Sequence, residues 1–404
     1  MDPTRSMALA LLRAVLEQRR PLEDALDRLP EAAPRDRAAA HRLAATVLRR
    51  MGCLDAVLEP HFSKAPPAPV RLILLIGAAQ LLFLDTPAHA AVATAVDLAR
   101  AEKLGPFAKF VNAVLRRVAD QGFALLGELD APRLDTPAWL WSSWGEAARA
   151  IATAHQTEAP IDLSLRPGAV APPGGVMLAT GSVRFPPGTR VAELPGYAEG
   201  HFWVQDAAAA LPARLLAVRP GELVADLCAA PGGKTAQLAA AGARVAAVDR
   251  DAKRLARVAE NLARLRLDAE LVEADAATWA PPHKFDAVLL DAPCSATGTI
   301  RRHPDVAHLK RPRDVAELAA NQRVLLASAA RLLKPGGRLI YAVCSLQPEE
   351  GPAQPGSARL VAAPFTHDEL PEGRTPEGQL RTHPGFWPEL GGMDGFFAAR
   401  FIKK

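Results

Sequence analysis

The feature that most constrains the fold is a set of apolar runs that alternates with helical stretches through the second half of the chain. Each run is rich in Leu and β-branched residues and lacks polar alternation, which is typical of a strand buried on both faces. Runs of this kind separated by helices predict a doubly wound parallel sheet. The predicted strands cover residues 223–228, 244–249, 269–274, 285–291 and 338–343, with helices at 235–240, 252–265 and 314–333 and a last strand, expected as an antiparallel edge, at 394–402.

The rest of the chain has a different pattern of apolar residues. Residues 7–16, 37–51, 70–84, 89–102 and 107–119 carry apolar side chains at three- and four-residue spacing, which predicts an all-α bundle. Brief apolar pieces among Pro and Gly follow, typical of short strands and loops. We therefore expect three domains: a helical bundle over residues 1–125, a small α+β insert over 126–204, and an α/β Rossmann-like domain over 205–404.

Composition excludes several classes of protein. The formal net charge of +4 is only a weak indication of a polyanionic partner. The four cysteines show neither C-x-x-C nor Cys/His ligand spacing, so we expect no metal site and no disulfide framework. The longest apolar run, residues 72–84, contains Gly77 and Gln80 and is too short to span a bilayer. We expect a soluble, cytoplasmic protein with no membrane partner.

A loop of small residues after the first predicted strand is the candidate cofactor site. Small residues let a ligand approach the backbone, and the following helix offers free N–H groups. A phosphate-binding loop would need Gly at position 228, and no G-x-G-x-x-G is present, which leaves S-adenosylmethionine. The loop residues are Cys228, Ala229, Ala230, Pro231, Gly232, Gly233 and Lys234.

Acidic residues at the next two strand ends support this interpretation. Asp249 ends the second strand and is placed to accept hydrogen bonds from ribose hydroxyls, while Asp275 follows the third strand and is placed to accept from the adenine amino group. Taken singly, each acid is more often a helix cap or a solvated turn residue. Three such features in order favour a cofactor site.

Two cysteines follow the last two parallel strands. Cys294 comes shortly after Asp291, and Cys344 ends the run at 338–343. Because ligands bind beyond the carboxyl ends of such strands, these groups should meet at the site. A thiolate that adds to C6 of a pyrimidine makes C5 nucleophilic enough to take a methyl group. The alternative is that both thiols are small buried hydrophobes. Three basic residues follow closely and are candidates for lowering a thiol pKa and for contacting RNA: Arg301, Arg302 and His303.

These segments together resemble a family of RNA cytosine-5 methyltransferases, the bacterial 16S ribosomal RNA type with an N-terminal NusB-like domain (the RsmB/Sun type). The matching stretches are residues 204–206, 226–235, 291–298, 301–305, 341–345, 348–350 and 394–397. The helical residues 13–118 are similar to the NusB-type bundle. Two departures stand out: Gly351 and Pro352 stand where the family continues into a helix, and Ser164 to Pro167 lack an expected Asn.

The resemblance implies a division of labour that spacing alone leaves open. Cys344 would be the nucleophile that attacks C6, and Cys294 would assist product release. Asp291 would orient the cytosine ring and border the cofactor, which would be held by residues 228–234, Asp249 and Asp275. The implied activity is formation of 5-methylcytosine in 16S ribosomal RNA by a monomer that uses S-adenosylmethionine.

Two other functions stay open at this point. One is cytosine-5 methylation of transfer RNA. The other is a non-catalytic NusB-like RNA-binding factor whose methyltransferase domain is vestigial; the presence of Asp291, Cys294 and Cys344 speaks against it.

Overall fold

The computed structural model describes residues 3–354, 359–369 and 372–404, and the chain divides by its internal contacts into two compact units. Unit 1 comprises Met1–Thr157 and Ile300–Lys310, and unit 2 comprises Glu158–Thr299 and Arg311–Lys404. The boundary at 157/158 lies inside the segment 126–204 predicted as a separate insert, and the three-domain division stays a prediction.

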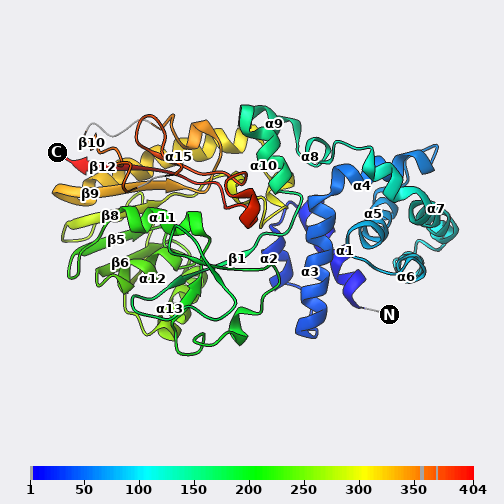
Figure 1. Ribbon diagram of the computed structural model, residues 1–404, viewed down its shortest axis with the longest axis horizontal. Helices are drawn as coiled ribbons and strands as arrows, with labels where there is room; N and C mark the ends of the chain where they lie inside the picture. The colour runs from blue at the N-terminus through cyan, green and yellow to red at the C-terminus, as the bar shows by residue number, and fades with distance from the viewer. Residues whose placement is uncertain (1–2, 355–358, 370–371) are drawn as a thin grey trace. The chain divides into compact units, whose positions relative to one another are not determined.

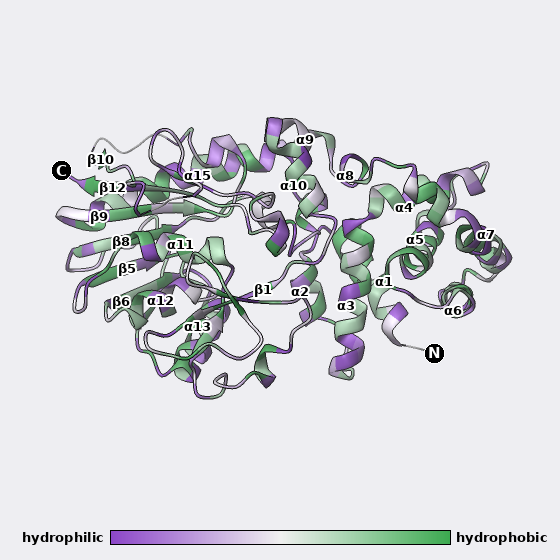
Figure 2. Cartoon of the chain, in the orientation of Figure 1, coloured by the Kyte–Doolittle hydropathy of each residue, from purple (hydrophilic) through white to green (hydrophobic). Residues whose placement is uncertain are grey.

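Unit 1 is helical throughout its described residues, as the periodicity of residues 7–119 predicts. Helix α5 is apolar on all sides and almost wholly buried, and the other long helices pack around it. Figure 2 shows both hydrophobic and hydrophilic stretches along these surrounding helices, as amphipathic helices require. The helices are α1 (Pro3–Leu16), α2 (Leu22–Asp27), α3 (Pro34–Arg49), α4 (Met51–Leu58), α5 (Ala68–Phe83), α6 (Ala88–Ala101), α7 (Ala108–Gly127), α8 (Ala131–Leu134), α9 (Ala138–Trp144), α10 (Ala148–Ala154) and α14 (Val306–Leu309).

Helix α14 is the one element of unit 1 that comes from far along the sequence. The backbone N–H of Leu22 donates to a carboxylate oxygen of Asp305 at 2.9 Å, and His308 hydrogen-bonds the carbonyl of Leu48 at 2.8 Å. Local patterning gave no sign that residues 300–310 pack with the N-terminal helices, because both bonds span more than 250 residues of sequence.

Unit 2 begins with a small antiparallel sheet of order β2-β3-β1-β4. The strands are β1 (Ile161–Leu165), β2 (Val176–Met177), β3 (Val183–Phe185) and β4 (Phe202–Val204). A buried ion pair joins Arg184 on β3 to Asp162 on β1, with both Nε–Oδ1 and Nη2–Oδ2 at 2.7 Å. Arg184 also donates to the carbonyls of Leu390 and Gly392, so this pair fixes the chain just before the last strand.

The main sheet has the order β10-β12-β9-β8-β5-β6-β7, with β11 paired to β12. The neighbours from β7 to β9 are parallel, and helices cover both faces, as the sequence predicts (Figure 1). The elements are α11 (Ala207–Leu215), β5 (Leu223–Leu227), α12 (Gly233–Ala240), β6 (Arg244–Asp249), α13 (Ala252–Leu265), β7 (Glu270–Glu273), β8 (Phe285–Asp291), α15 (Pro312–Leu332), β9 (Leu333–Val343), β10 (Leu360–Ala362), β11 (Leu380–Arg381) and β12 (Phe397–Lys403).

The last strand differs from its prediction in one respect. β12 does run antiparallel to β9, with Phe397 opposite Val343. It is not the edge, because β10 pairs with its other side, Leu360 opposite Lys403. Three-residue β10 lies in a Pro- and Gly-rich stretch and carries too little apolar pattern to be recognised from sequence.

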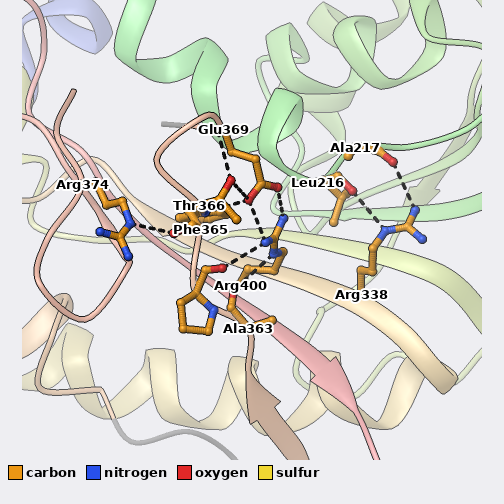
Figure 3. Close-up of polar contacts among 10 residues, drawn as sticks. Leu216, Ala217, Arg338, Ala363, Phe365, Thr366, Glu369, Arg374 and Arg400 are labelled. Atoms are coloured by element: carbon orange, nitrogen blue, oxygen red, sulfur yellow. Dashed lines mark hydrogen bonds and ion pairs between the residues drawn. The ribbon is translucent and has the colours of Figure 1, made fainter. Parts of the chain in front are cut away.

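Polar contacts fasten the segment between β10 and β11 to β12. Arg400 on β12 forms an ion pair with Glu369 at 2.5 Å and donates to the carbonyl of Ala363 (Figure 3). The hydrogen bond and charge of Arg400 lower the pKa of Glu369 to about 2. On β9, Arg338 donates to the carbonyls of Leu216 and Ala217, which fixes the end of α11 (Figure 3).

Candidate active site

The sheet order decides how the predicted site residues meet. The strands that precede Cys344, Asp291, Cys228, Asp249 and Asp275 lie side by side in the order β9-β8-β5-β6-β7. All five strands are parallel, so their carboxyl ends share one edge of the sheet. The predicted cofactor residues therefore follow β5, β6 and β7, and the predicted catalytic residues follow β8 and β9.

The turn between β5 and α12 has a backbone that side chains rarely permit. Cys228 has φ of +62°, and Gly232 has φ of +98°, where a Cβ atom would lie 2.9 Å from Val258. Before the turn, Asp226 is buried, and one of its oxygens accepts a hydrogen bond from the hydroxyl of Thr235 at 2.6 Å. Burial raises the pKa of Asp226 to about 7. The turn is therefore tightly held and exposes backbone rather than side chain.

Asp249 and Asp275 connect the neighbouring strand ends. The Asp249 carboxylate accepts from the backbone N–H of Ala230 at 3.2 Å and of Asp251 at 3.1 Å. Its backbone oxygen accepts from Ala274 N–H at 3.1 Å, next to Asp275. Asp249 is buried and Asp275 is exposed, with one carboxylate oxygen accepting from Ala277 N–H. A carboxylate oxygen accepts about two hydrogen bonds, so each acid retains capacity for a ligand.

Lys234 connects the predicted cofactor loop to the predicted catalytic residues. Its Nζ lies 2.7 Å from Oδ2 of Asp291 and 5.2 Å from the ring centroid of Phe396. Burial opposes the charge of Lys234, but the Asp291 carboxylate and the Cys344 sulfur outweigh it and raise the pKa of the ammonium group. The ammonium group thus stays charged beside both groups.

The two predicted catalytic thiols are in contact. The Sγ atoms of Cys294 and Cys344 lie 3.4 Å apart, although fifty residues separate them in sequence. The hydrogen bond with Cys344 and burial raise the pKa of Cys294 well above its ordinary value. The turns also meet through backbone, because Gly298 N–H donates to the Cys344 carbonyl at 3.0 Å and Gly395 N–H to the Gly298 carbonyl at 2.8 Å.

Comparisons with protein families and known proteins agree with this geometry. Residues 213–402 match the family described as 16S rRNA methyltransferase RsmB/F, and residues 2–120 match the NusB family. Over 100% of its length the chain is 37% identical to the ribosomal RNA small subunit methyltransferase B of Erwinia tasmaniensis, covering 99% of that protein. It is 39% identical to the protein of the same name from Pseudomonas syringae pv. tomato, covering 97% of that protein.

The chain belongs to the RsmB/F family. The crystal structure of PH0851 has the same fold, with a TM-score of 0.74 over 98% of each chain at 22% identity. The family resemblance drawn from the sequence motifs and the predicted fold class, a NusB-like bundle followed by a Rossmann-like methyltransferase domain, are both confirmed.

The three basic residues that follow Cys294 in the sequence belong to unit 1. Arg301 belongs to unit 1, where it is fully buried and its carbonyl accepts from Arg49 at 3.1 Å. Arg302 is half-buried and His303 is exposed. The Cys344 sulfur interacts electrostatically with Lys234, which the sequence predicted as a cofactor residue. RNA contact by residues 301–303 stays a prediction.

Sequence reasoning missed one polar group close to both thiols. Glu350 is 0% exposed and accepts hydrogen bonds from the residues that follow Cys294 and Cys344. Glu350 lies in the matching stretch 348–350, but a Glu beside Pro348, Glu349 and Gly351 looks like a solvated turn, so its burial was not expected. Among the described residues that follow Cys344, Pro348–Glu350 form a single 3₁₀ turn.

Two negative findings complete the description. Within residues 3–354, 359–369 and 372–404, no cluster of three or more His, Cys, Asp or Glu side chains is placed to bind a metal ion. None of the helices found in those ranges combines the length and the apolar character that crossing a bilayer would take.

Proposed function

We propose that this RsmB/F-family protein forms 5-methylcytosine in 16S ribosomal RNA, with S-adenosylmethionine as methyl donor and a transient covalent bond between Cys344 and C6 of the target cytosine. The observation that carries the proposal is the contact between the two thiols, 3.4 Å apart, at the strand edge where Lys234 pairs with Asp291. A mechanism in which one thiol attacks the base and a second assists product release needs two thiols close together, beside a fixed acid and a fixed cation.

The groups at the carboxyl ends of strands β5, β6 and β7 fit S-adenosylmethionine, the proposed cofactor. The Gly232–Gly233 backbone admits close approach, the N-terminus of α12 follows at once, and Asp249 and Asp275 supply acceptors for ribose hydroxyls and an adenine amino group. Oδ1 of Asp226 is buried without a hydrogen-bond partner beneath this turn, a sign of unused polar capacity at the site. When bound, S-adenosylmethionine would supply an electrophilic methyl group.

The chain's own residues would do the following. The Cys344 thiolate would add to C6 and form the S–C6 bond, while the C5–C6 π electrons become available at C5. C5 would then bond to the methyl carbon, whose bond to the sulfonium sulfur of the donor breaks and leaves its electron pair on that sulfur. A base would then take the C5 proton, the C5–H electrons restore the C5–C6 double bond, and the S–C6 bond breaks with its electron pair returning to the Cys344 sulfur. Asp291 orients the ring, and Cys294 assists this release.

The RNA would be gripped mainly outside the catalytic edge. The NusB match over residues 2–120 supports an RNA-binding role for unit 1. The ribosomal substrate is supported by the shared family and by full-length relatives named for the small subunit. The target base must leave its stack to reach Cys344, at an unstacking cost of about a few kcal/mol that the protein–RNA contacts must offset.

The experiment is transfer of labelled methyl from S-adenosylmethionine to unmethylated 16S ribosomal RNA, with denaturing gels to detect covalent adducts. We expect Cys344→Ala to abolish transfer and Cys294→Ala to accumulate an RNA–protein adduct. Cys53→Ala is the matched control, because Cys53 lies buried in unit 1. Normal activity of Cys344→Ala would refute the assigned nucleophile. Transfer to tRNA alone would replace the substrate, and failure to bind the cofactor would favour the vestigial domain.

A further inference from the structure

Glu350 is a fully buried carboxylate with an unusually complete set of donors. Oε1 accepts from the backbone N–H of Ser295 at 2.8 Å and from the side-chain amide of Gln322 at 3.0 Å. Oε2 accepts from the hydroxyls of Ser295 and Ser345, each at 2.5 Å. Four donors on two oxygens saturate the carboxylate and match its ionised form.

Three of these four donors belong to the two turns that carry the thiols. Ser295 directly follows Cys294, and Ser345 directly follows Cys344. The two hydroxyl oxygens are 3.0 Å apart, which parallels the 3.4 Å contact between the neighbouring sulfur atoms. One carboxylate therefore joins two turns that the chain supplies from different strands.

Further bonds fix Glu350 itself. Gln322 on α15 donates to the carbonyl of Pro293 at 2.9 Å as well as to Glu350. The hydroxyl of Tyr341, on β9, lies 2.5 Å from the backbone carbonyl of Glu350. Side chains from helix α15 and strand β9 therefore hold Glu350 in place.

The charge of Glu350 acts on the thiol of Cys294. It is one of the groups that raise the pKa of Cys294, after the hydrogen bond from Cys344 and burial. Lys234, of opposite charge, acts on Cys344. A negative neighbour favours a protonated thiol, which is the form that the proposed role of Cys294 in release requires.

We propose that Glu350 is a positioning residue for methyl transfer: its buried carboxylate ties the turn of Cys294 to the turn of Cys344, holds the two sulfur atoms in contact and keeps Cys294 as the protonated member of the pair. The inference rests on the two-cysteine reaction proposed above. Glu350 does not touch the substrate in this role and acts through the two turns.

Glu350→Gln is the informative variant, because it removes the charge with little change of shape. The amide oxygen can accept from Ser295 N–H and Gln322, while the amide N–H₂ faces two hydroxyls that can rotate to accept. The fold should therefore survive. Glu350→Asp keeps the charge but shortens the reach, and Glu349→Gln, at an exposed neighbour, is the matched control.

Two measurements separate positioning from a merely structural role. The first is alkylation of Cys294 and Cys344 by iodoacetamide across pH, mapped by mass spectrometry, which needs no substrate. In Glu350→Gln we expect Cys294 to become reactive at a pH lower by about one unit, since a buried charge has been removed. The second is steady-state methyl transfer with denaturing gels. We expect kcat to fall by about tenfold to a hundredfold with nearly unchanged KM, and RNA adduct to accumulate as in Cys294→Ala.

The outcomes divide clearly. Wild-type alkylation profiles and kcat in Glu350→Gln would overturn the inference. So would a loss of activity matched by a lower melting midpoint without adduct or altered alkylation, which would mark a structural role. If the wild type itself transfers no methyl to any RNA offered, the proposed function fails, whereas the alkylation profiles still decide whether Glu350 sets the two thiols apart.

Discussion

Asp226 gives the sharpest quantitative test of the site's electrostatics. It lies at the end of β5, buried, with the Thr235 hydroxyl on one oxygen and no hydrogen-bond partner on the other. Burial raises the pKa of Asp226 from 3.8 to about 7. The hydrogen bond from Thr235 lowers this pKa, and the negative charge of Asp291 raises it further. That difference corresponds to about 4 kcal/mol of stability.

The sign follows from proton binding. Between pH 4 and pH 7 the folded chain keeps the Asp226 proton after the unfolded chain has lost it, so stability falls as pH rises through this window. The contribution is fully present below about pH 4 and is lost above about pH 7. About 3 kcal/mol of the change falls between pH 5 and pH 8, which is about a hundredfold in an opening equilibrium.

Asp226→Asn removes this titration and keeps an acceptor for Thr235. The assay is backbone hydrogen exchange of β5 peptides between pH 5 and pH 8, corrected for the intrinsic pH dependence of exchange. Between pH 5 and pH 8 we expect the exchange protection of β5 in the wild type to fall about a hundredfold more than it does in Asp226→Asn. At low pH the variant should be about 1–3 kcal/mol less stable than the wild type. Peptides of α5, in unit 1, are the internal control. Parallel pH profiles of β5 in the two proteins would refute the reasoning.

Two further predictions concern packing around the site. In Gly298→Ala the new Cβ would lie 2.0 Å from the Gly395 carbonyl oxygen, so we expect the melting midpoint to fall by several degrees and methyl transfer to be reduced. Gly127→Ala, which has open space around the new Cβ, should be neutral. A Gly298→Ala protein that is fully active and as stable as the wild type would contradict this prediction. Arg184→Met leaves the buried Asp162 carboxylate without its ion pair, and we expect chemical denaturation to show a loss of about 3–5 kcal/mol, against little change for the exposed pair in Arg190→Met. A loss below about 1 kcal/mol at Arg184 would show that the chain rearranges to pair Asp162 again.

The parts of this protein that sequence could predict are those with a local signal. The runs at 244–249 and 285–291 have the same bounds as β6 and β8, because a strand buried on both faces needs continuous apolar side chains. The juxtaposition of Asp249, Asp291 and Cys344 along one edge then follows from the order of parallel strands. Nothing local marks Glu350 as buried, or residues 300–310 as part of unit 1, since both depend on contacts made across the fold.

The two thiols illustrate how this long-range part refines the chemistry. Sequence places Cys294 and Cys344 at neighbouring strand ends but leaves their roles symmetrical, and only the family resemblance distinguished nucleophile from helper. In the structure their surroundings are opposite in charge: Lys234 acts on Cys344, and Glu350 acts on Cys294. A thiol beside an anion keeps its proton, which the proposed role of Cys294 in release requires. These surroundings come from the turns that the sheet brings together, so the fold adds to the family motif a physical difference between the two cysteines on which the proposed division of labour can rest.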